Sequence, residues 1–354
     1  MRIAVMCSGY GLVPRGVETF LHDLMPRLRK LRPGWSFDVY TRAPSGWEAD
    51  GIRLIHVPAI SRDSKAATLY AQIGHRLGFF LRTRIDAEGL SFAIAASSKL
   101  ALSKYDLIFN QAGPFMGWFL ALRKPFGFPP IAHKTASGYS PLELIMKRQR
   151  PDLMIATSPF VENWLRNTPP ETPVVCIPNG VDCDLFHPRA SEAPIELQGL
   201  QRPIVLFIGA IDPMKRPELA IDAMAEMGQG SLVMIGDGIL REQITASGLQ
   251  RLGPSRFLSL PYIPHGRLPD FYRASNVFTL PSEEPFGIVF LEALACNTPI
   301  VANRGPVQSW IVQDAGLTCN CENPAYYAAA LHKALTTNFG NRPRLRAEAF
   351  DWDI

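Results

Sequence analysis

The chain has 354 residues, of which 47% are hydrophobic and 19% charged, and its formal net charge is +4. This length favours two domains, and this composition is that of a globular protein rather than a disordered or fibrous one. The sequence contains no run of eighteen apolar residues, so a membrane-spanning helix is not expected.

In the first half, short apolar runs alternate with helical patterns. We expect strands at residues 2–7, 36–41, 51–57, 105–110, 129–135 and 152–157, and clear helices at 17–31 and 159–166. A mostly helical stretch spans residues 62–104. The opening apolar run is too short for a secretory signal peptide and suits a buried strand followed by a tight turn.

The second half repeats this rhythm. We expect strands at residues 203–210, 231–237, 256–260, 276–281 and 299–303, and helices at 217–227, 239–247, 268–274 and 287–296. Apolar strands that alternate with helices indicate parallel sheets covered on both faces. The fold class is therefore α/β, with two doubly wound parallel sheets. The polar, Pro-rich segment 178–203 is the expected hinge, and we divide the chain into domains at 1–188 and 189–354.

The two halves differ in charge. Residues 1–180 hold 22 Lys and Arg against 13 Asp and Glu, and the remainder holds 14 against 19. A basic first half indicates an anionic partner, or simply a basic surface. Its stretch HRLGFFLRTR at 75–84 suits an anionic membrane surface or a helix whose Arg side chains point to solvent. No nucleic-acid-reading element is recognisable, so we expect no nucleic-acid partner.

The six cysteines have neither CxxC spacing nor a suitably spaced His partner. Disulfides and a zinc site are therefore not expected, and the composition indicates the reducing cytoplasm.

Two loops of the second half carry groups suited to anions. Lys215 and Arg216 precede a helix that Pro217 can begin, and cations beside a helix N-terminus favour anion binding. A solvated Lys-Arg pair is the alternative. Gly236 and Gly238 give a tight turn after the next strand, with Asp237 as a helix cap.

The stretch EEPFGIVFLEALA, residues 283–295, is the most informative. Its helix should begin near Phe286, which leaves the N–H groups of Gly287, Ile288 and Val289 at the open end, where a phosphate or a sugar hydroxyl can bind. The helix dipole explains acids at 283 and 284. It does not explain Glu292 within an otherwise apolar helix, where a carboxylate suits the vicinal diol of a ribose or hexose.

The Glu-x7-Glu spacing in residues 284–292 resembles the signature of retaining GT-B glycosyltransferases, especially family 4. Further pieces occur in the expected order: PNGVD with F-x-P at 178–188, GAIDPMKRPELAIDA at 209–223, IGDG at 235–238 and FYRASNVFTLPS at 271–282. The resemblance implies two Rossmann-like domains facing across a cleft, with the acceptor bound by the first and the donor by the second.

The resemblance also implies roles for individual residues. Glu284 would contact the donor sugar hydroxyls, Glu292 would hold the nucleotide ribose, and Lys215 would neutralise the diphosphate. Phe286, Gly287, Ile288 and Val289 would form the loop over the sugar and diphosphate, and Ile263 would hold the nucleotide base. Gly209, Arg216 and Gly236 are further expected positions near the donor. Gly16 would lie beneath the reacting sugar. His133 would lie beside the donor sugar as a catalytic-site residue, or it is structural.

Three features depart from the family pattern or compete with it. Ala210 stands where relatives commonly have Arg, and Arg216 is the candidate to supply that charge. The end AEAFDWDI comes where relatives begin a last helix, so we expect an incomplete interdomain clamp. Asp182-Cys183-Asp184 reads as the DxD metal motif of the other glycosyltransferase fold, but it lies in the hinge, and we expect no metal.

We therefore expect a cytoplasmic, metal-independent, retaining hexosyltransferase without a cofactor. It would use a nucleotide-diphosphate sugar and a sugar, lipid-linked or small-molecule acceptor, with peripheral contact to the inner face of the membrane as an option. The alternatives are an inverting transferase, a nucleotide-sugar epimerase and a non-catalytic sugar-nucleotide-binding module.

Overall fold

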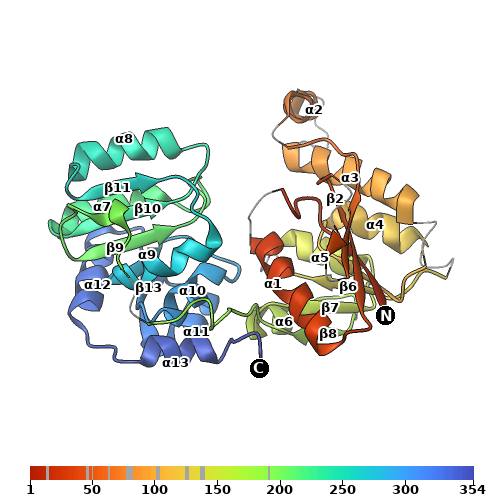
Figure 1. The fold of residues 1–354 in the computed structure, drawn as a ribbon. Coiled ribbons are helices and arrows are strands. Elements are labelled where there is room, and N and C mark those ends of the chain that lie inside the picture. The colour runs from red at the N-terminus through yellow and green to blue at the C-terminus, as the bar shows by residue number, and fades with distance from the viewer. Residues whose placement is uncertain are drawn as a thin grey trace. The chain divides into compact units, whose positions relative to one another are not determined.

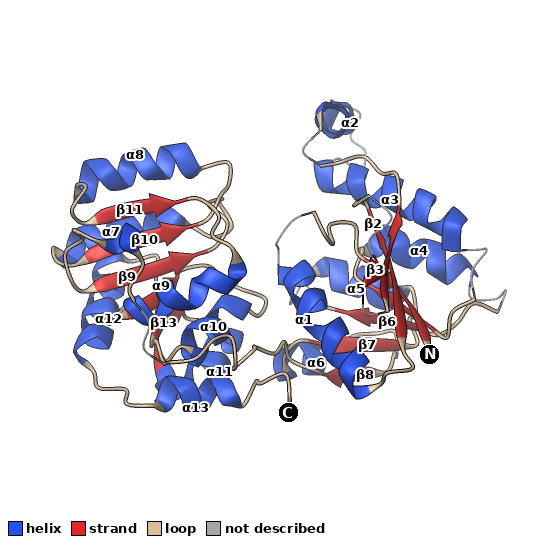
Figure 2. Cartoon of the chain, viewed as in Figure 1, coloured by secondary structure: helices blue, strands red, loops and turns tan. Residues whose placement is uncertain are grey.

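The computed structural model describes residues 1–12, 16–44, 48–49, 51–62, 64–76, 83–100, 104–123, 127–135, 140–189 and 192–354. The chain forms two compact units, Met1–Pro178 and Asn179–Ile354. Each unit contains one sheet with helices packed around it (Figures 1 and 2). The predicted α/β class with two doubly wound sheets is confirmed.

The first unit contains an eight-stranded sheet in the order β3-β4-β2-β1-β5-β6-β7-β8. Its strands are β1 (Arg2–Met6), β2 (Ser36–Thr41), β3 (Glu48–Ala49), β4 (Ile52–His56), β5 (Leu107–Asn110), β6 (Ile131–Lys134), β7 (Leu153–Ala156) and β8 (Val174–Cys176). All neighbours pair in parallel except β3, which is antiparallel to β4. The six predicted strands are present, and β3 and β8 were not predicted.

The helices of the first unit are α1 (Gly16–Leu31), α2 (Lys65–Arg76), α3 (Arg84–Leu100), α4 (Pro114–Arg123), α5 (Pro141–Arg148) and α6 (Pro159–Arg166). Helices α2 and α3 confirm the helical character expected between residues 62 and 104. Residues 77–82 of the basic stretch 75–84 lie outside the described residues. Apolar side chains of α3 and α4 pack with those of β1, β2 and β5 in a buried cluster.

The second unit contains a six-stranded parallel sheet in the order β11-β10-β9-β12-β13-β14. Its strands are β9 (Ile204–Ile208), β10 (Ser231–Ile235), β11 (Phe257–Leu260), β12 (Val277–Leu280), β13 (Ile300–Asn303) and β14 (Gly316–Cys319). Its helices are α7 (Pro217–Met227), α8 (Arg241–Leu252), α9 (Leu268–Ala274), α10 (Ile288–Ala295), α11 (Pro306–Val312), α12 (Pro324–Thr336) and α13 (Arg342–Glu348), with short 3₁₀ turns at Ile195–Leu197, His265–Arg267 and Gln313–Ala315. Helix α7 contacts α8 and α12, and α10 contacts α9, α11 and α13 (Figure 1).

The first part of the predicted hinge is packed into the second unit. Val181, Cys183 and Phe186 belong to its buried core. The guanidinium of Arg344, on α13, donates hydrogen bonds to the carbonyl oxygens of Cys183 and Phe186 at 3.1 and 2.8 Å. Val181 also forms a bridge with Asp351. The segment that follows Pro178 is therefore anchored to the second unit by burial and hydrogen bonding.

Among the described helices, none combines the length and the apolar character that crossing a bilayer requires.

Candidate functional site

The loops that follow β9 and β10 approach each other closely. Gly236 has a φ of +151°, and a Cβ at this position would lie 1.9 Å from the carbonyl oxygen of Gly209. The N–H of Ile211 donates to the carbonyl oxygen of Asp237 at 2.9 Å. Only glycine allows this approach at 236, because any Cβ would overlap backbone atoms. The carboxyl ends of the neighbouring strands β9 and β10 are thus held together without intervening side chains.

Lys215 and Glu284 are brought together from two different loops. The side chain of Asp212 accepts from the N–H groups of Met214 and Lys215, which fixes the turn after β9. Nζ of Lys215 lies 2.6 and 2.7 Å from the two carboxylate oxygens of Glu284. Ser282 donates its hydroxyl to Oε1 of Glu284 at 2.5 Å. The side chains of Lys215 and Glu284 are 27% and 8% exposed, so this is a partly buried ion pair with access from solvent.

Arg216 points to a different acid. It is the residue before α7, has a φ of +53°, and its guanidinium lies 2.8 Å from Glu322. Glu322 is 65% exposed. Because the two backbone conformations differ, Lys215 and Arg216 are directed to separate acidic partners rather than to one shared site.

The start of α10 differs in detail from the sequence prediction. The helix begins at Ile288, after Gly287 with a φ of +81°. A Cβ at Gly287 would lie 2.6 Å from the ring of Phe290. The side chain of Phe286 is buried, and its ring packs against Trp310 and Phe350. Phe286 therefore anchors the loop, and the backbone at residues 287–289 forms the helix N-terminus.

Glu292 lies in the interior of α10 and is buried. Its Oε1 is 2.9 Å from Nε2 of His265, and its Oε2 accepts a hydrogen bond of 2.8 Å from the Tyr272 hydroxyl. The ring of Phe186 packs edge-on against both His265 and Tyr272. The carboxylate that the sequence left without a partner is therefore held by two groups.

His265 and Tyr272 are absent from the sequence prediction. Tyr272 lies in the quoted stretch FYRASNVFTLPS, whereas His265 is a lone histidine after Pro264 and shows no pattern. Ile263, the expected base-binding position, is buried two residues before His265. Proximity in sequence to Ile263 was the one available signal for His265.

His133 and Gly16 belong to the first unit. His133 is buried in β6, where Nδ1 lies 2.9 Å from the carbonyl oxygen of Asn110 and Nε2 lies 3.3 Å from Glu143. Gly16 begins α1, and a Cβ there would have open space around it. The ring of His133 is thus engaged by protein groups on both nitrogens.

Lys134, next to His133, is a buried cation over the ring of Phe20, with Nζ 4.3 Å from the ring centre. Burial lowers the pKa of Lys134 from 10.5 to about 7, although Glu143 opposes this change. Between these pH values the unfolded chain binds more protons than the folded chain, so stability should rise with pH.

We therefore predict that the free energy of unfolding of the wild type rises relative to that of Lys134→Met between pH 7 and pH 9. The expected slope is up to about 1.4 kcal/mol per pH unit. Urea unfolding at several pH values measures it, and Lys104→Met at an exposed position is the control. Parallel curves for the wild type and Lys134→Met would contradict a depressed pKa.

Comparison with known proteins identifies the family. The model for glycosyl transferases group 1 matches residues 189–352, and the model for glycosyltransferase family 4 matches residues 14–185. The chain belongs to the group 1 glycosyltransferases. The resemblance found in the sequence is thereby confirmed at the level of the family.

Two D-inositol 3-phosphate glycosyltransferases are among the relatives of this group 1 glycosyltransferase. The protein from Acidothermus cellulolyticus is 34% identical over 198 residues, which cover 49% of this chain and 41% of the relative. The protein from Xylanimonas cellulosilytica is 32% identical over 199 residues, which cover 50% and 48%. The chain therefore spans less than half the length of these relatives.

Solved structures show the same GT-B fold. Sucrose-phosphate synthase from Thermosynechococcus elongatus has a TM-score of 0.78 at 23% identity, with 99% of this chain and 95% of that chain covered. Anabaena HepE in complex with UDP and glucose has a TM-score of 0.72 at 17% identity, with 99% and 96% covered. At these identities the match establishes the fold of this glycosyltransferase and leaves its substrates open.

Proposed function

We propose that this chain is a retaining, metal-independent transferase that moves a hexosyl group from a nucleotide-diphosphate sugar to an acceptor hydroxyl. The observation that carries the proposal is the ion pair between Lys215 and Glu284 near the N-terminus of α10, with Glu292 further along the same helix. The second unit would bind the donor and the basic first unit the acceptor.

Each group has a distinct part in the proposed reaction. The bond between the anomeric carbon and the diphosphate breaks, and the acceptor oxygen bonds to that carbon on the same face. The acceptor proton passes to the leaving phosphate oxygen. Lys215 keeps one of its three N–H donors for that phosphate, since Glu284 takes two. The N–H groups at the start of α10 add further positive potential where charge develops.

The two glutamates would bind hydroxyl groups rather than act as acid and base. Glu284 already accepts from Ser282 and Lys215, and it retains lone pairs for a sugar hydroxyl. Glu292 would bind the ribose diol, either in place of its contact with His265 or in addition to that contact. No cofactor enters this scheme, and the charge of Lys215 takes the place of a metal ion at the diphosphate.

We predict that one of the UDP, GDP or ADP sugars raises the melting temperature of the wild type. A donor at a hundred times its Kd should add about 2.7 kcal/mol to the free energy of unfolding. The shift should disappear in Glu284→Ala and persist in Glu283→Gln, which alters an exposed neighbouring acid. If none of the three nucleotide classes produces a shift, the proposed donor site is wrong.

Product analysis separates the alternatives. The anomeric configuration of the product distinguishes retention from inversion, and conversion of the sugar nucleotide without acceptor would reveal an epimerase. Unchanged transfer in EDTA supports metal independence. Binding without turnover would favour a non-catalytic module. Ala210, which stands where relatives commonly have Arg, is the feature that favours this outcome.

The proposed location is the cytoplasm. All six cysteines are free thiols, as the reducing cytoplasm requires.

For the proposed membrane contact, α2 exposes Leu69 and Ile73 together with Arg76. Co-sedimentation with phosphatidylglycerol vesicles would test that contact.

A further inference from the structure

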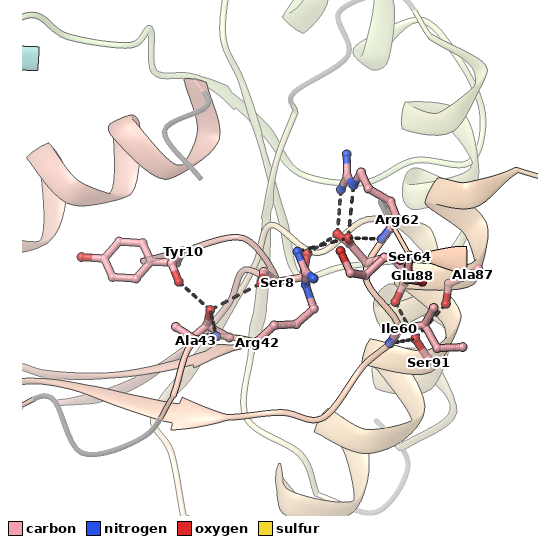
Figure 3. A network of polar contacts seen from close by, with 12 residues as sticks. Ser8, Tyr10, Arg42, Ala43, Ile60, Arg62, Ser64, Ala87, Glu88 and Ser91 are labelled. Carbon is pink, nitrogen blue, oxygen red and sulfur yellow. Dashed lines mark hydrogen bonds and ion pairs between the residues drawn. The ribbon is translucent and has the colours of Figure 1, made fainter. Parts of the chain in front are cut away.

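A polar network lies at the carboxyl ends of two adjacent strands of the first unit (Figure 3). Ser8 follows β1, Arg42 follows β2, Arg62 comes after β4, and Glu88 is on α3. The side chain of Glu88 is only 2% exposed. The proposed donor chemistry uses none of these residues, although doubly wound sheets bind ligands at this edge.

The carboxylate of Glu88 is already saturated. Oε1 accepts from the hydroxyl of Ser8 at 3.0 Å and from Nη2 of Arg62 at 2.7 Å. Oε2 accepts from the backbone N–H and from Nε of Arg62 at 3.1 and 3.2 Å. Burial alone would raise the pKa of Glu88, but the bonds and charge of Arg62 outweigh burial and lower it to about 2. These bonds use the lone-pair sites that a carboxylate offers, so Glu88 is an anion matched by Arg62.

Because Arg62 already matches the charge of Glu88, Arg42 adds a positive charge and N–H donors that Glu88 does not satisfy. Its Nη2 lies 3.3 Å from Oε2 of Glu88, an ion-pair contact longer than the four hydrogen bonds. The side chain is only 11% exposed, and among the described residues its Nε has no hydrogen-bond partner. Counting only the described residues, the cluster therefore holds two guanidinium groups and one carboxylate. A buried cation and a buried unpaired donor are both costly unless another anion approaches.

The backbone around Arg42 is fixed in place. Its N–H donates to the carbonyl oxygen of Ser8 at 3.1 Å, which joins the ends of β1 and β2. The hydroxyl of Thr41 donates to the carbonyl oxygen of Tyr10 at 2.6 Å and accepts from the N–H of Ala43 at 3.1 Å. A rigid turn of this kind presents the guanidinium without much loss of conformational entropy on binding.

We propose that Arg42 binds an oxyanion, a phosphate or a carboxylate, carried by the acceptor. A planar guanidinium recognises either group with two parallel hydrogen bonds, and Glu88 with Arg62 holds that guanidinium in position. The acceptor would then be an anionic polyol or sugar, such as a sugar phosphate or a sugar acid. This inference rests on the proposed function, because it assumes that the first unit binds the acceptor.

Calorimetric titration without a donor tests the site. The probes are glucose 6-phosphate, glucuronate, glucose and inorganic phosphate. We expect wild type to bind at least one of the three anions and to bind glucose more weakly than any anion that binds. Arg42→Gln should lower that anion affinity tenfold or more. Arg32→Gln, which removes an exposed arginine before the other end of β2, should leave it unchanged.

The hexose anion that binds tells whether the acceptor group is a phosphate or a carboxylate. Binding of inorganic phosphate alone, with the same dependence on Arg42, supports the anion site and excludes these two hexoses as acceptors. Failure of all three anions to bind wild type, or equal affinity in Arg42→Gln, overturns the proposal. Because no donor is present, such a failure is independent of the nucleotide-sugar test.

A second variant tests the site independently of Arg42→Gln, in case that variant misfolds. Glu88→Gln leaves two cations without a buried anion, so it should be less stable than the wild type. Inorganic phosphate should raise its melting temperature by more than it raises that of the wild type. An equal or smaller rise would contradict an oxyanion site at Arg42.

Discussion

Lys215→Met should lower the rate of sugar transfer by about a hundredfold or more. The variant removes the cation proposed to stabilise charge on the leaving diphosphate, and losing one such group typically costs about 10²–10³ in kcat. It also leaves Glu284, whose side chain is 8% exposed, without its ion-pair partner. Breaking a buried pair costs about 3–5 kcal/mol, and partial exposure of Lys215 should reduce this to about 1–2 kcal/mol.

A double-mutant cycle separates the two effects. Glu284→Gln keeps the shape of the side chain and removes its charge, so the double variant Lys215→Met with Glu284→Gln should regain most of the lost stability. Its transfer rate should stay low, because neither proposed donor contact is restored. Urea unfolding measures the stability of each variant, and initial rates measure its sugar transfer.

Arg216→Met is the matched control for this cycle. Its partner Glu322 is 65% exposed, so the stability change should be within about 1 kcal/mol. Recovery of the transfer rate in the double variant would show that Lys215 serves only to neutralise Glu284, and the proposed catalytic role would then be wrong.

The strand pattern could be predicted because it is local. All eleven expected strands are present, since a buried parallel strand is an apolar run between turn residues. The strands β8 (Val174–Cys176) and β14 (Gly316–Cys319) were missed because they are short and lie at sheet edges, where fewer apolar residues are needed. Helix α8 starts at Arg241 rather than at residue 239, a difference within the first turn.

The contacts of the site could be predicted only in part. The sequence singles out Lys215 and Glu284 separately, but their contact depends on how the loops after β9 and β12 meet in space. The hydrogen-bond partners of Glu292 are His265 and Tyr272, which lie 27 and 20 residues earlier in the sequence. The surplus charge of Arg42 likewise emerges only from the packing of β2 and α3, because Arg42 and Glu88 are far apart in the sequence.

Glu292→Ala should combine a loss of stability with a loss of nucleotide affinity. The buried hydroxyl of Tyr272 would lose its acceptor, which costs about 1–3 kcal/mol. A charged group that binds a ribose hydroxyl contributes about 1.5–3 kcal/mol, so affinity for the nucleoside diphosphate should fall about tenfold or more. Glu292→Gln keeps an acceptor for Tyr272 and should lose less stability. Calorimetry and urea unfolding measure the two effects.

The ribose contact can be isolated by changing the ligand as well as the protein. Wild type should bind the 2′,3′-dideoxy analogue of the preferred nucleoside diphosphate about tenfold more weakly than the parent compound, because Glu292 then lacks its diol. Glu292→Ala should bind the two compounds equally. His265→Ala should retain most of the discrimination, since His265 contacts the carboxylate from the protein side and Tyr272 still holds Glu292 in place. A variant Glu292→Ala that still distinguishes the two nucleotides would place the ribose elsewhere, and Glu292 would then be a buried structural acid held by His265 and Tyr272.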